Sequence, residues 1–505
     1  MNKSILSYLE ETQKKFPDKV AFSDNNYEIT YNELVRCAKS IGSSILERVG
    51  ARKPIVVYME KDSRNIAAFM GAAYSGGFYV PLDSKMPIDR INIILNTLNP
   101  EVIIYDDKTK KYLDLLNTNC LKLSYDEISQ LDPNDEKLNS ARNQMIDTDP
   151  LYILFTSGST GIPKGVVVCH RSVIDYADWV IKTFNINEKT VFGNQTPFYF
   201  SMSVLDIFST ILSGATLHII PKMLFSFPVK LLEFLKEKEV NTIYWVPSAL
   251  SIVANLGALK EVDMQNLKTI LFAGETMPTK QLNIWKKYIP DAVYANLFGP
   301  TEITDIGIYY VVDRDFSNDE PIPIGKPCDN VDAIVINKEG RLVEKVGEVG
   351  ELLIRGSFLA CGYYNNPQKT KEAFIQNPLN NNYPETVYCT GDLVYWNERH
   401  ELVYVSRKDF QIKHMGNRIE LGEIENSINS LEYVEMCCCL YDENNKHIVA
   451  VYSGNIEEKA MHKMLIKKLP RYMIPNVYYK EDKLPLNMNG KIDRVKLKNN
   501  ILINN

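Results

Sequence analysis

The chain has 505 residues, of which 45% are hydrophobic and 24% are charged, and its formal net charge is -6. This composition is typical of a globular protein, and the length predicts two or more domains. A mildly acidic chain without a block of lysine and arginine is not expected to have nucleic acid as its main partner. The N-terminus lacks the apolar core of a signal peptide and no apolar run has membrane-spanning length, so we expect a cytoplasmic protein.

Cysteine and histidine patterns argue against several kinds of site. The nine cysteines include no CxxC pair with metal-ligand spacing, and we expect them to be reduced and mostly buried. Cys437, Cys438 and Cys439 fall in VEMCCCLYD, which predicts a strand and not a catalytic site. The six histidines are scattered, so their spacing predicts neither a metal site nor a Ser-His-Asp triad.

Strands and amphipathic helices alternate through the first 320 residues. ITYNELVRCAKSIGSSILERV (29–49) predicts a short strand and then a helix with one apolar stripe. The alternation predicts an α/β body with largely parallel sheets. The segments that carry it are 29–49, 54–60, 63–77, 101–106, 203–220, 240–246 and 267–274.

The pattern changes after about residue 320. Strands and turns follow one another in DAIVINKEGRLV, GELLIRG, TVYCTGDLVYW and ELVYVSRKDFQIK, which predicts a β-rich lobe beside the α/β body. The tail from about residue 410 has a strand–helix pattern of its own. Polar SRKDFQIK (406–413) is therefore the candidate domain boundary.

A loop of small polar residues, FTSGSTGIPKG (155–165), separates two runs of β-formers. Its glycines allow the backbone to approach a ligand, and its N–H groups and hydroxyls can donate to anionic oxygens. The loop is not a Walker A sequence, because Pro163 precedes Lys164 and a strand-like VVV follows. It is either a phosphate-binding loop of another fold or a solvated hairpin turn.

Four further segments carry acids, hydroxyls or a lysine. LFAGETMP (271–278) and NLFGPTEIT (296–304) each end an apolar strand, and ligands of parallel α/β sheets gather at the carboxyl ends of strands. Glu302 has the chemistry of a Mg²⁺ ligand, and the two oxygens of Asp392 could accept both hydroxyls of a ribose. Lys491, in LPLNMNGKIDR, could neutralise charge during group transfer.

In this order the motifs resemble the carboxylate-adenylating superfamily of acyl-CoA synthetases, firefly luciferase and the adenylation domains of nonribosomal peptide synthetases. The resemblance runs from ITYNEL through FTSGSTGIPKG, NLFGPTE, YCTGDL and SRKDFQIKHMGNRIELGEIE to NMNGKIDR, over nearly the whole chain. These motifs are most similar to those of freestanding adenylation domains that serve a carrier protein. Such domains act in secondary metabolism or, like the D-alanine ligases, in teichoic acid metabolism. The resemblance implies a large AMP-binding domain (1–408) of layered α/β sheets with a β-rich lobe, and a small mobile α+β domain (409–505) that turns at Asp409.

The resemblance also implies roles for individual residues. ATP would react with a carboxylic acid to give acyl-AMP and pyrophosphate, with Lys491 bridging the two reactants and Glu302 holding Mg²⁺. Phe298 would stack on the adenine, where the family usually has tyrosine. Rotation of the small domain would then withdraw Lys491 and bring Lys413 and the turn 414–418 to a pantetheine thiol. The nucleotide contacts implied are Thr156, Ser157, Gly158, Ser159, Thr160, Lys164, Gly274, Glu275, Asn296, Phe298, Gly299, Thr301, Asp392, Tyr404, Arg407 and Lys491.

The acid pocket departs from that of α-amino-acid activators. Those relatives carry an aspartate for the α-ammonium where this chain has Ser201, and a buried ammonium without a carboxylate is costly. Either Asp305 pairs with an amine that lies away from the carboxylate, as in a β-amino, ω-amino or aminoaryl acid, or it points to solvent and the acid is a neutral aryl, hydroxy or short fatty acid. Asp206 is interpreted as structural. Matching places Ser201, Met202, Leu205, Tyr244, Leu271, Ala273, Leu297, Asp305 and Ile306 in the pocket.

Rival functions share part of this pattern. An acyl-CoA synthetase differs only in the thiol acceptor, whereas NRIELGEIE and the compact length favour a carrier protein. Only 14 residues follow Lys491, so we expect the carrier to be a separate protein. A binding module without activity would be expected to lack Lys491, Glu302 or Asp392, and all three are present.

Overall fold

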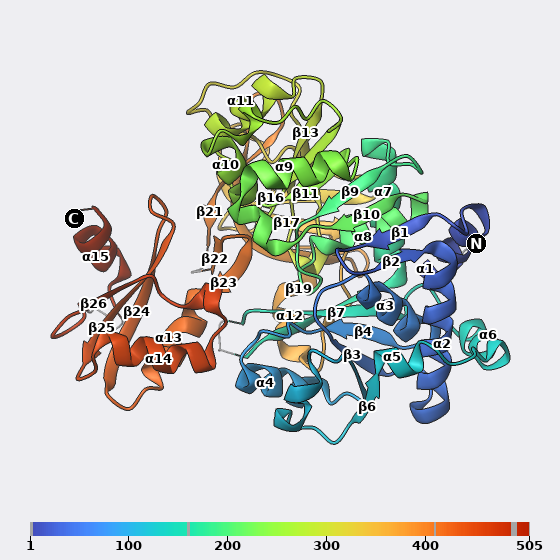
Figure 1. Cartoon of the computed structure of the whole chain (residues 1–505). Coiled ribbons are helices and arrows are strands. Elements are labelled where there is room, and N and C mark those ends of the chain that lie inside the picture. The colour runs from blue at the N-terminus through green and yellow to red at the C-terminus, as the bar shows by residue number, and fades with distance from the viewer. Residues whose placement is uncertain (1–3, 159–161, 409–410, 486–491, 504–505) are drawn as a thin grey trace.

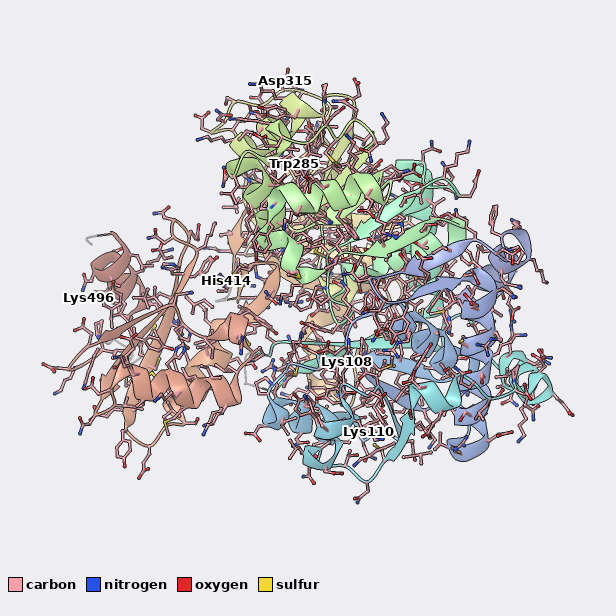
Figure 2. All side chains as sticks on the ribbon, viewed as in Figure 1. Lys108, Lys110, Trp285, Asp315, His414 and Lys496 are labelled. Atoms are coloured by element: carbon pink, nitrogen blue, oxygen red, sulfur yellow. The ribbon has the colours of Figure 1, made fainter. Side chains whose placement is uncertain are left out.

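The computed structural model describes residues 4–158, 162–408, 411–485 and 492–503, and the fold is a layered α/β body with a smaller C-terminal part (Figure 1). In Figure 1 the elements β24–β26 and α13–α15, in orange and red, lie to one side of the rest. Two strands, β22 (Gln411–His414) and β23 (Asn417–Glu420), form a hairpin between the two parts. Figure 2 shows His414, at the end of β22, at this junction.

The first large sheet has the strand order β15-β14-β13-β12-β11-β9-β10-β1-β2. Its central pairs are parallel, as predicted from the alternating strands and helices. Its strands are β1 (Val20–Ser23), β2 (Glu28–Thr30), β9 (Val191–Asn194), β10 (Thr216–Ile219), β11 (Thr242–Trp245), β12 (Thr269–Phe272), β13 (Val293–Phe298), β14 (Ile308–Val311) and β15 (Lys326–Pro327).

The second large sheet has the order β18-β8-β7-β4-β3-β5-β6. Residues 54–58 are all buried, as expected of a central parallel strand. Its strands are β3 (Pro54–Tyr58), β4 (Phe78–Pro81), β5 (Val102–Tyr105), β6 (Leu121–Ser124), β7 (Pro150–Thr156), β8 (Lys164–Cys169) and β18 (Gly362–Tyr363).

Helices join the two sheets into one core. Helix α2 (Tyr31–Val49) begins at a capping box, in which Thr30 and Glu33 satisfy each other's backbone N–H groups. It packs on α3 (Arg64–Tyr74), and α1 (Ile5–Lys15) bridges both to α7 (His170–Phe184) and α8 (Ser203–Ser213). The remaining helices of the body are α4 (Ile88–Leu98), α5 (Tyr125–Ile128), α6 (Asp135–Asn143), α9 (Pro228–Glu237), α10 (Pro247–Asn255), α11 (Thr279–Tyr288) and α12 (Pro367–Ala373).

A β-rich lobe follows, as the change of pattern after residue 320 predicts. It contains β16 (Val331–Ile336), β17 (Gly350–Gly356), β19 (Phe374–Gln376), β20 (Thr386–Trp396) and β21 (Leu402–Arg407). The C-terminal part has an apolar core of its own. It is built from α13 (Leu421–Asn429), β24 (Val434–Asp442), β25 (His447–Gly454), α14 (Glu458–Lys468), β26 (Val477–Lys480) and α15 (Arg494–Lys498).

One expectation about the fold lies outside the described residues. It concerns Asp409, the predicted hinge, so the boundary between residues 408 and 409 stays a prediction. Cys437, Cys438 and Cys439 lie on buried β24, in agreement with the predicted strand. In the described part of the chain, no helix is long and apolar enough to cross a membrane.

Candidate active site

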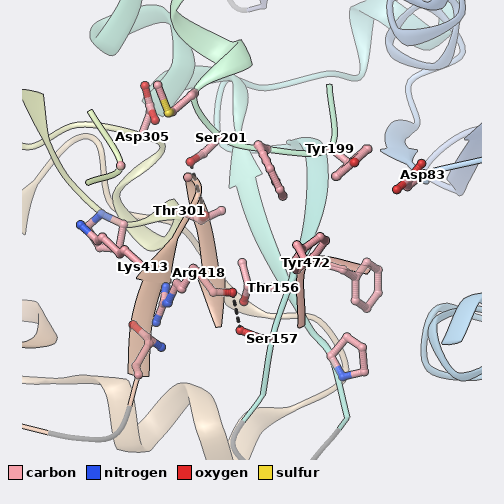
Figure 3. A pocket seen from close by; sticks show the side chains of 18 of the residues that line it. Asp83, Thr156, Ser157, Tyr199, Ser201, Thr301, Asp305, Lys413, Arg418 and Tyr472 are labelled. Atoms are coloured by element: carbon pink, nitrogen blue, oxygen red, sulfur yellow. Dashed lines mark hydrogen bonds between the residues drawn. The ribbon is translucent and has the colours of Figure 1, made fainter. Parts of the chain in front are cut away.

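A cleft lies where the hairpin β22–β23 meets the carboxyl ends of the body's strands. With its open mouth it encloses about 1160 Å³. Figure 3 shows Asp305 and Ser201 near one end, and Tyr199 and Asp83 near the other. Predicted site residues that line it are Thr156, Ser157, Ser201, Met202, Ala273, Gly274, Gly299, Thr301, Asp305, Ile306, Asp392, Arg407 and Lys413.

The predicted phosphate loop joins β7 to β8 as an antiparallel hairpin, in which Thr156 lies opposite Lys164. Ser157 Oγ donates to the carbonyl of Arg418 at 2.8 Å (Figure 3), and the N–H of Gly158 donates to Glu423 Oε2 at 3.3 Å. Burial and the nearby Arg418 guanidinium lower the pKa of Lys164. Ser159 and Thr160 lie outside the described residues. The loop therefore contacts the C-terminal part through main-chain and carboxylate groups.

Glu302, the predicted magnesium ligand, is fully buried and both of its oxygens are engaged. Oε2 forms an ion pair with Arg418 of β23 at 2.5 Å, and Oε1 accepts from the Tyr363 hydroxyl at 2.7 Å. Burial alone would raise the pKa of Glu302, but Arg418 and Lys164 hold it at about 2. The carboxylate is therefore anionic, and in this arrangement a guanidinium balances its charge.

The predicted adenine contacts lie at the end of β13. The amide of Asn296 donates to the Pro323 carbonyl at 2.8 Å, which fixes the orientation of this side chain. The Phe298 ring lies 4.6 Å from Lys413 Nζ and 6.0 Å from the Tyr404 ring. Burial lowers the pKa of Lys413. The ring of Phe298 is thus covered by residues from β21 and β22.

Asp392 and Arg407, the predicted ribose contacts, pair with each other, and Glu275 links two segments near them. Asp392 Oδ1 and Arg407 form an ion pair at 3.1 Å, and both side chains are largely buried. Glu275 accepts from the N–H groups of Ser248 at 2.9 Å and Gly416 at 3.0 Å. Glu275 thereby ties the turn of the hairpin β22–β23 to the body.

Asp305 lies in the interior, with 1% of its surface exposed. It accepts from the Tyr176 hydroxyl at 2.7 Å and the Tyr244 hydroxyl at 3.1 Å, and it also hydrogen-bonds Ser201. Burial raises the pKa of Asp305 to about 7, against the lowering effect of these three hydroxyls. The alternative in which Asp305 points to solvent is wrong, because α7 and β11 close over the side chain.

The predicted acid-pocket residues divide into two layers. Ser201, Met202, Ala273, Asp305 and Ile306 line the cleft itself. A second set is buried behind them, of which Tyr244 reaches Asp305 through its hydroxyl. This set comprises Leu205, Tyr244, Leu271 and Leu297.

Several groups at the site carry no sequence-based role. Tyr176 and Tyr363 hold the two key carboxylates, and Arg418 pairs with Glu302. Arg90 of α4 forms a buried ion pair with Glu423 of α13, which also joins the two parts. Arg418 and Glu423 belong to the recognised stretch NRIELGEIE, but nothing in that stretch indicates their partners. Lys491 lies outside the described residues, so its role stays a prediction.

Asp206, interpreted as structural, is 2% exposed on α8. It accepts from the Asn194 amide at 2.6 Å. Burial raises its pKa to about 7, which the neighbouring Lys61 opposes. Burial also lowers the pKa of Lys61 to about 7.

Asp206→Ala should therefore lower the free energy of unfolding by about 1–3 kcal/mol, because the buried amide of Asn194 loses its acceptor. Urea denaturation measures the loss. Asp178→Ala is the matched control, since Asp178 makes an exposed ion pair with Lys182 at 2.5 Å, and it should change stability by less than about 0.5 kcal/mol. Equal losses for both variants would contradict the structural role of Asp206.

Comparison with known proteins agrees with this geometry. The family model described as AMP-binding enzyme matches residues 9–364. A D-alanine–D-alanyl carrier protein ligase of Bacillus licheniformis is 31% identical over 98% of this chain and 99% of its own length. Zwittermicin A synthase ZmaJ of Bacillus cereus is 30% identical over 98% of this chain and 94% of its own.

Among solved structures, the adenylation domain AlmE of Vibrio cholerae in complex with glycyl-adenosine-5'-phosphate superposes with a TM-score of 0.85. It covers 99% of this chain and 98% of its own at 22% identity, which shows a common fold. The fold, the full-length likeness to the ligase and the convergence of the phosphate loop, Thr301 and Asp392 on one cleft agree with one another. The chain belongs to the AMP-binding enzyme family, and it is an AMP-forming carboxylate ligase of the adenylation superfamily.

Proposed function

We propose that this ligase activates an acid whose amine lies away from the carboxylate, as in a β-amino, ω-amino or aminoaryl acid, and transfers the acyl group to the phosphopantetheine thiol of a separate carrier protein. One observation supports the choice of acid: the buried carboxylate of Asp305 lies in the acid pocket. In the described part of the chain, hydroxyl groups and no cation surround it.

The pocket favours a charged substrate group at its far end. A buried carboxylate is costly without a counter-charge, and an ammonium from the substrate would supply one. Ser201, which stands where α-amino-acid activators have aspartate, offers no charge near the reacting carboxylate. Met202, Ala273 and Ile306 provide apolar surface between these ends. The acid best suited to this lining has an apolar middle and a distal amine.

The first step needs two anions, the acid and ATP, brought together. The phosphate loop would hold the β- and γ-phosphates, Asn296 and Phe298 the adenine, and Asp392 the ribose. Lys491 would lie between the two reactants and neutralise charge as the carboxylate attacks the α-phosphorus, so that proximity and charge balance supply most of the rate. Pyrophosphate is the leaving group.

The metal expected for this step is Mg²⁺, and Glu302 fits it. The side chain is anionic, buried and next to Thr301, which would contact the α-phosphate. Magnesium prefers one or two carboxylates together with phosphate oxygens. When bound, it would balance the charge of the leaving pyrophosphate. Arg418 pairs with the same carboxylate in this arrangement, so the hairpin β22–β23 must withdraw before a metal ion takes its place.

The arrangement described here suits the second step. Lys413 and the turn at Gly416 line the cleft, as expected when the thiol attacks the mixed anhydride and AMP leaves. A relative of equal length is named a ligase of a carrier protein, which supports a carrier over coenzyme A as acceptor. Acyl-CoA synthesis and D-alanine activation are the alternatives that the experiment separates.

Pyrophosphate exchange into ATP with a panel of acids tests the choice of acid. We expect β-amino, ω-amino or aminoaryl acids to give rates at least about tenfold above alanine and above neutral isosteres, as a difference of about 1.4 kcal/mol in binding produces. Highest exchange with an ordinary α-amino acid would show that Ser201 does not exclude the α-ammonium. If a hydroxyaryl acid gives the highest exchange rate, Asp305 is instead protonated and donates a hydrogen bond to the hydroxyl of the substrate. Thioester formation with coenzyme A and with carrier proteins then identifies the acceptor.

A further inference from the structure

Two cysteines that the adenylation chemistry does not use lie next to each other behind Glu302. Cys169 ends β8, and Cys361 immediately precedes β18, the strand that pairs with β8. The N–H of Cys361 donates to the Val167 carbonyl at 2.8 Å, and the two thiols hydrogen-bond each other. Gly362 is the partner of Val167 in this pairing, so Cys361 lies beside Val167, and Cys169 is two residues further along β8. Residues two apart on a strand point to the same face, so Cys169 shares a face with Val167.

Cys169 lies where a thiolate is stabilised. It is the N-cap of α7, a helix of 15 residues, and the N-terminal end of a helix favours negative charge. Its sulfur is hydrogen-bonded to the Ser172 hydroxyl at 3.3 Å. The hydrogen bond from Cys361 is the largest of the effects that lower the pKa of Cys169, to about 6, against burial.

The two thiols differ in access. Cys361 is exposed to solvent, whereas Cys169 is 6% exposed. An oxidant can therefore reach Cys361 directly, and Cys169 is the neighbouring nucleophile. In the described residues no group of three or more histidine, cysteine or acidic side chains is placed to hold a metal ion, so the pair is not part of such a cluster. An exposed thiol beside a stabilised thiolate is the usual arrangement of a dithiol that forms a disulfide.

We propose that Cys169 and Cys361 form a reversible disulfide when the protein meets an oxidised low-molecular-weight disulfide, and that this bond lowers adenylation activity. The Cys169 thiolate accepts the proton of Cys361, and the resulting Cys361 thiolate attacks the small disulfide RSSR, giving a mixed disulfide and one RS⁻. This RS⁻ takes the proton from Cys169, whose thiolate then attacks the sulfur of Cys361 and releases the second RS⁻. One S–S bond breaks and one forms, the two cysteines are oxidised, and the products are one RSH and one RS⁻, which takes its proton from solvent.

The expected effect on activity follows from the hydrogen bonds between the segment 358–363 and the Glu302 loop. The N–H of Ala360 donates to the Glu302 carbonyl at 2.9 Å, and the Tyr363 hydroxyl donates to the Glu302 carboxylate. Thr304 Oγ1 donates to the Phe358 carbonyl at 2.8 Å. A covalent bond at Cys361 would pull on both ends of this segment. The residue most directly displaced would be Glu302.

A further contact carries the same strain to the acid pocket. The Phe358 ring packs edge-on against Tyr176, with centroids 5.5 Å apart, and Tyr176 donates to Asp305. The disulfide would therefore shift the positions of both Glu302 and Asp305. A cross-link elsewhere on the surface would not be expected to affect both.

The test exposes the full-length protein to oxidised glutathione and then digests it without reduction for mass spectrometry. We expect one linked pair of peptides containing Cys169 and Cys361, a pyrophosphate-exchange rate reduced at least about fivefold, and recovery of both with dithiothreitol. Cys361→Ser should keep its rate under oxidation and give no linked pair. Cys37→Ser, a half-buried thiol on α2, is the matched control and should respond like the unaltered protein.

Three outcomes would overturn the proposal. Glutathione that stays on Cys361 without a link to Cys169 shows that the pair does not close. A linked pair with an unchanged exchange rate shows that the segment 358–363 does not transmit the strain. Loss of activity that persists in Cys361→Ser assigns the effect to another residue. Because the peptide masses do not depend on turnover, the test for the linked pair is independent of which acid the enzyme activates.

Discussion

Asp305→Asn should reduce kcat/KM for an amine-bearing acid by about 100-fold to several thousand-fold, while neutral acids of the same shape change by no more than about threefold. The reason is that the substitution leaves the substrate's ammonium buried without a counter-charge, which costs about 3 to 5 kcal/mol when one partner of a buried pair is removed. The two side chains have nearly the same volume, so packing around Tyr176 and Tyr244 is preserved. Pyrophosphate exchange with matched amine and neutral acids measures the ratio.

The pH dependence gives this prediction an independent control. The pKa of Asp305 is raised to about 7 by burial, so the carboxyl is largely protonated below that pH and ionised above it. For an amine-bearing acid, kcat/KM should therefore fall by up to about tenfold per pH unit below 7 and level off above it. The titratable groups near Asp305 are Tyr152, Tyr176, Asp206, Tyr244 and Cys328.

The variant Asp305→Asn should lose that inflection. An inflection that persists in the variant would assign the titration to another group, of which Asp206 is the first candidate because its pKa is also raised to about 7. If Asp305→Asn lowers kcat/KM equally for amine-bearing and neutral acids, the assignment of Asp305 to a substrate amine is contradicted.

The sequence predicted the elements whose signals are local. The alternation of apolar strands and amphipathic helices predicted the α/β body. A hairpin turn was one of two alternatives for the glycine-rich segment between two β runs, and in the structure Thr156 and Lys164 do face each other in a hairpin. The segment 203–220, which contains Asp206, was correctly assigned to the alternating strands and helices, since it forms α8 and β10. Such signals depend on side-chain period and turn chemistry, which a single stretch of chain contains.

Contacts between distant segments could not be predicted in the same way. Tyr176 and Asp305 are 129 residues apart, and Glu302 and Arg418 are 116 residues apart. A tyrosine on an apolar helix face has the same local pattern whether its hydroxyl meets a carboxylate or another partner. For this reason the sequence left the orientation of Asp305 open, and only the packing of α7 and β11 over it decides between the two alternatives.

Arg418→Gln should separate the two half-reactions. Thioester formation from pre-formed acyl-adenylate should fall by about 100-fold or more, because buried Glu302 would lose its ion-pair partner in the arrangement that suits the second step and keep only the charge of Lys164 nearby, at about 3 kcal/mol or more. Pyrophosphate exchange should stay within about threefold of the unaltered enzyme, since the first step requires Glu302 to be released from Arg418. Rapid-quench measurements of each half-reaction test the separation.

The matched control is Arg399→Gln, which removes the same charge from an exposed turn between β20 and β21 and should alter neither step. Equal losses in both half-reactions of Arg418→Gln would contradict a role confined to the second arrangement and would instead place the guanidinium in adenylation. The expected selectivity rests on one carboxylate. Glu302 is buried and anionic, so it requires a cation in either domain arrangement, and the identity of that cation, metal ion or Arg418, would distinguish the first step from the second.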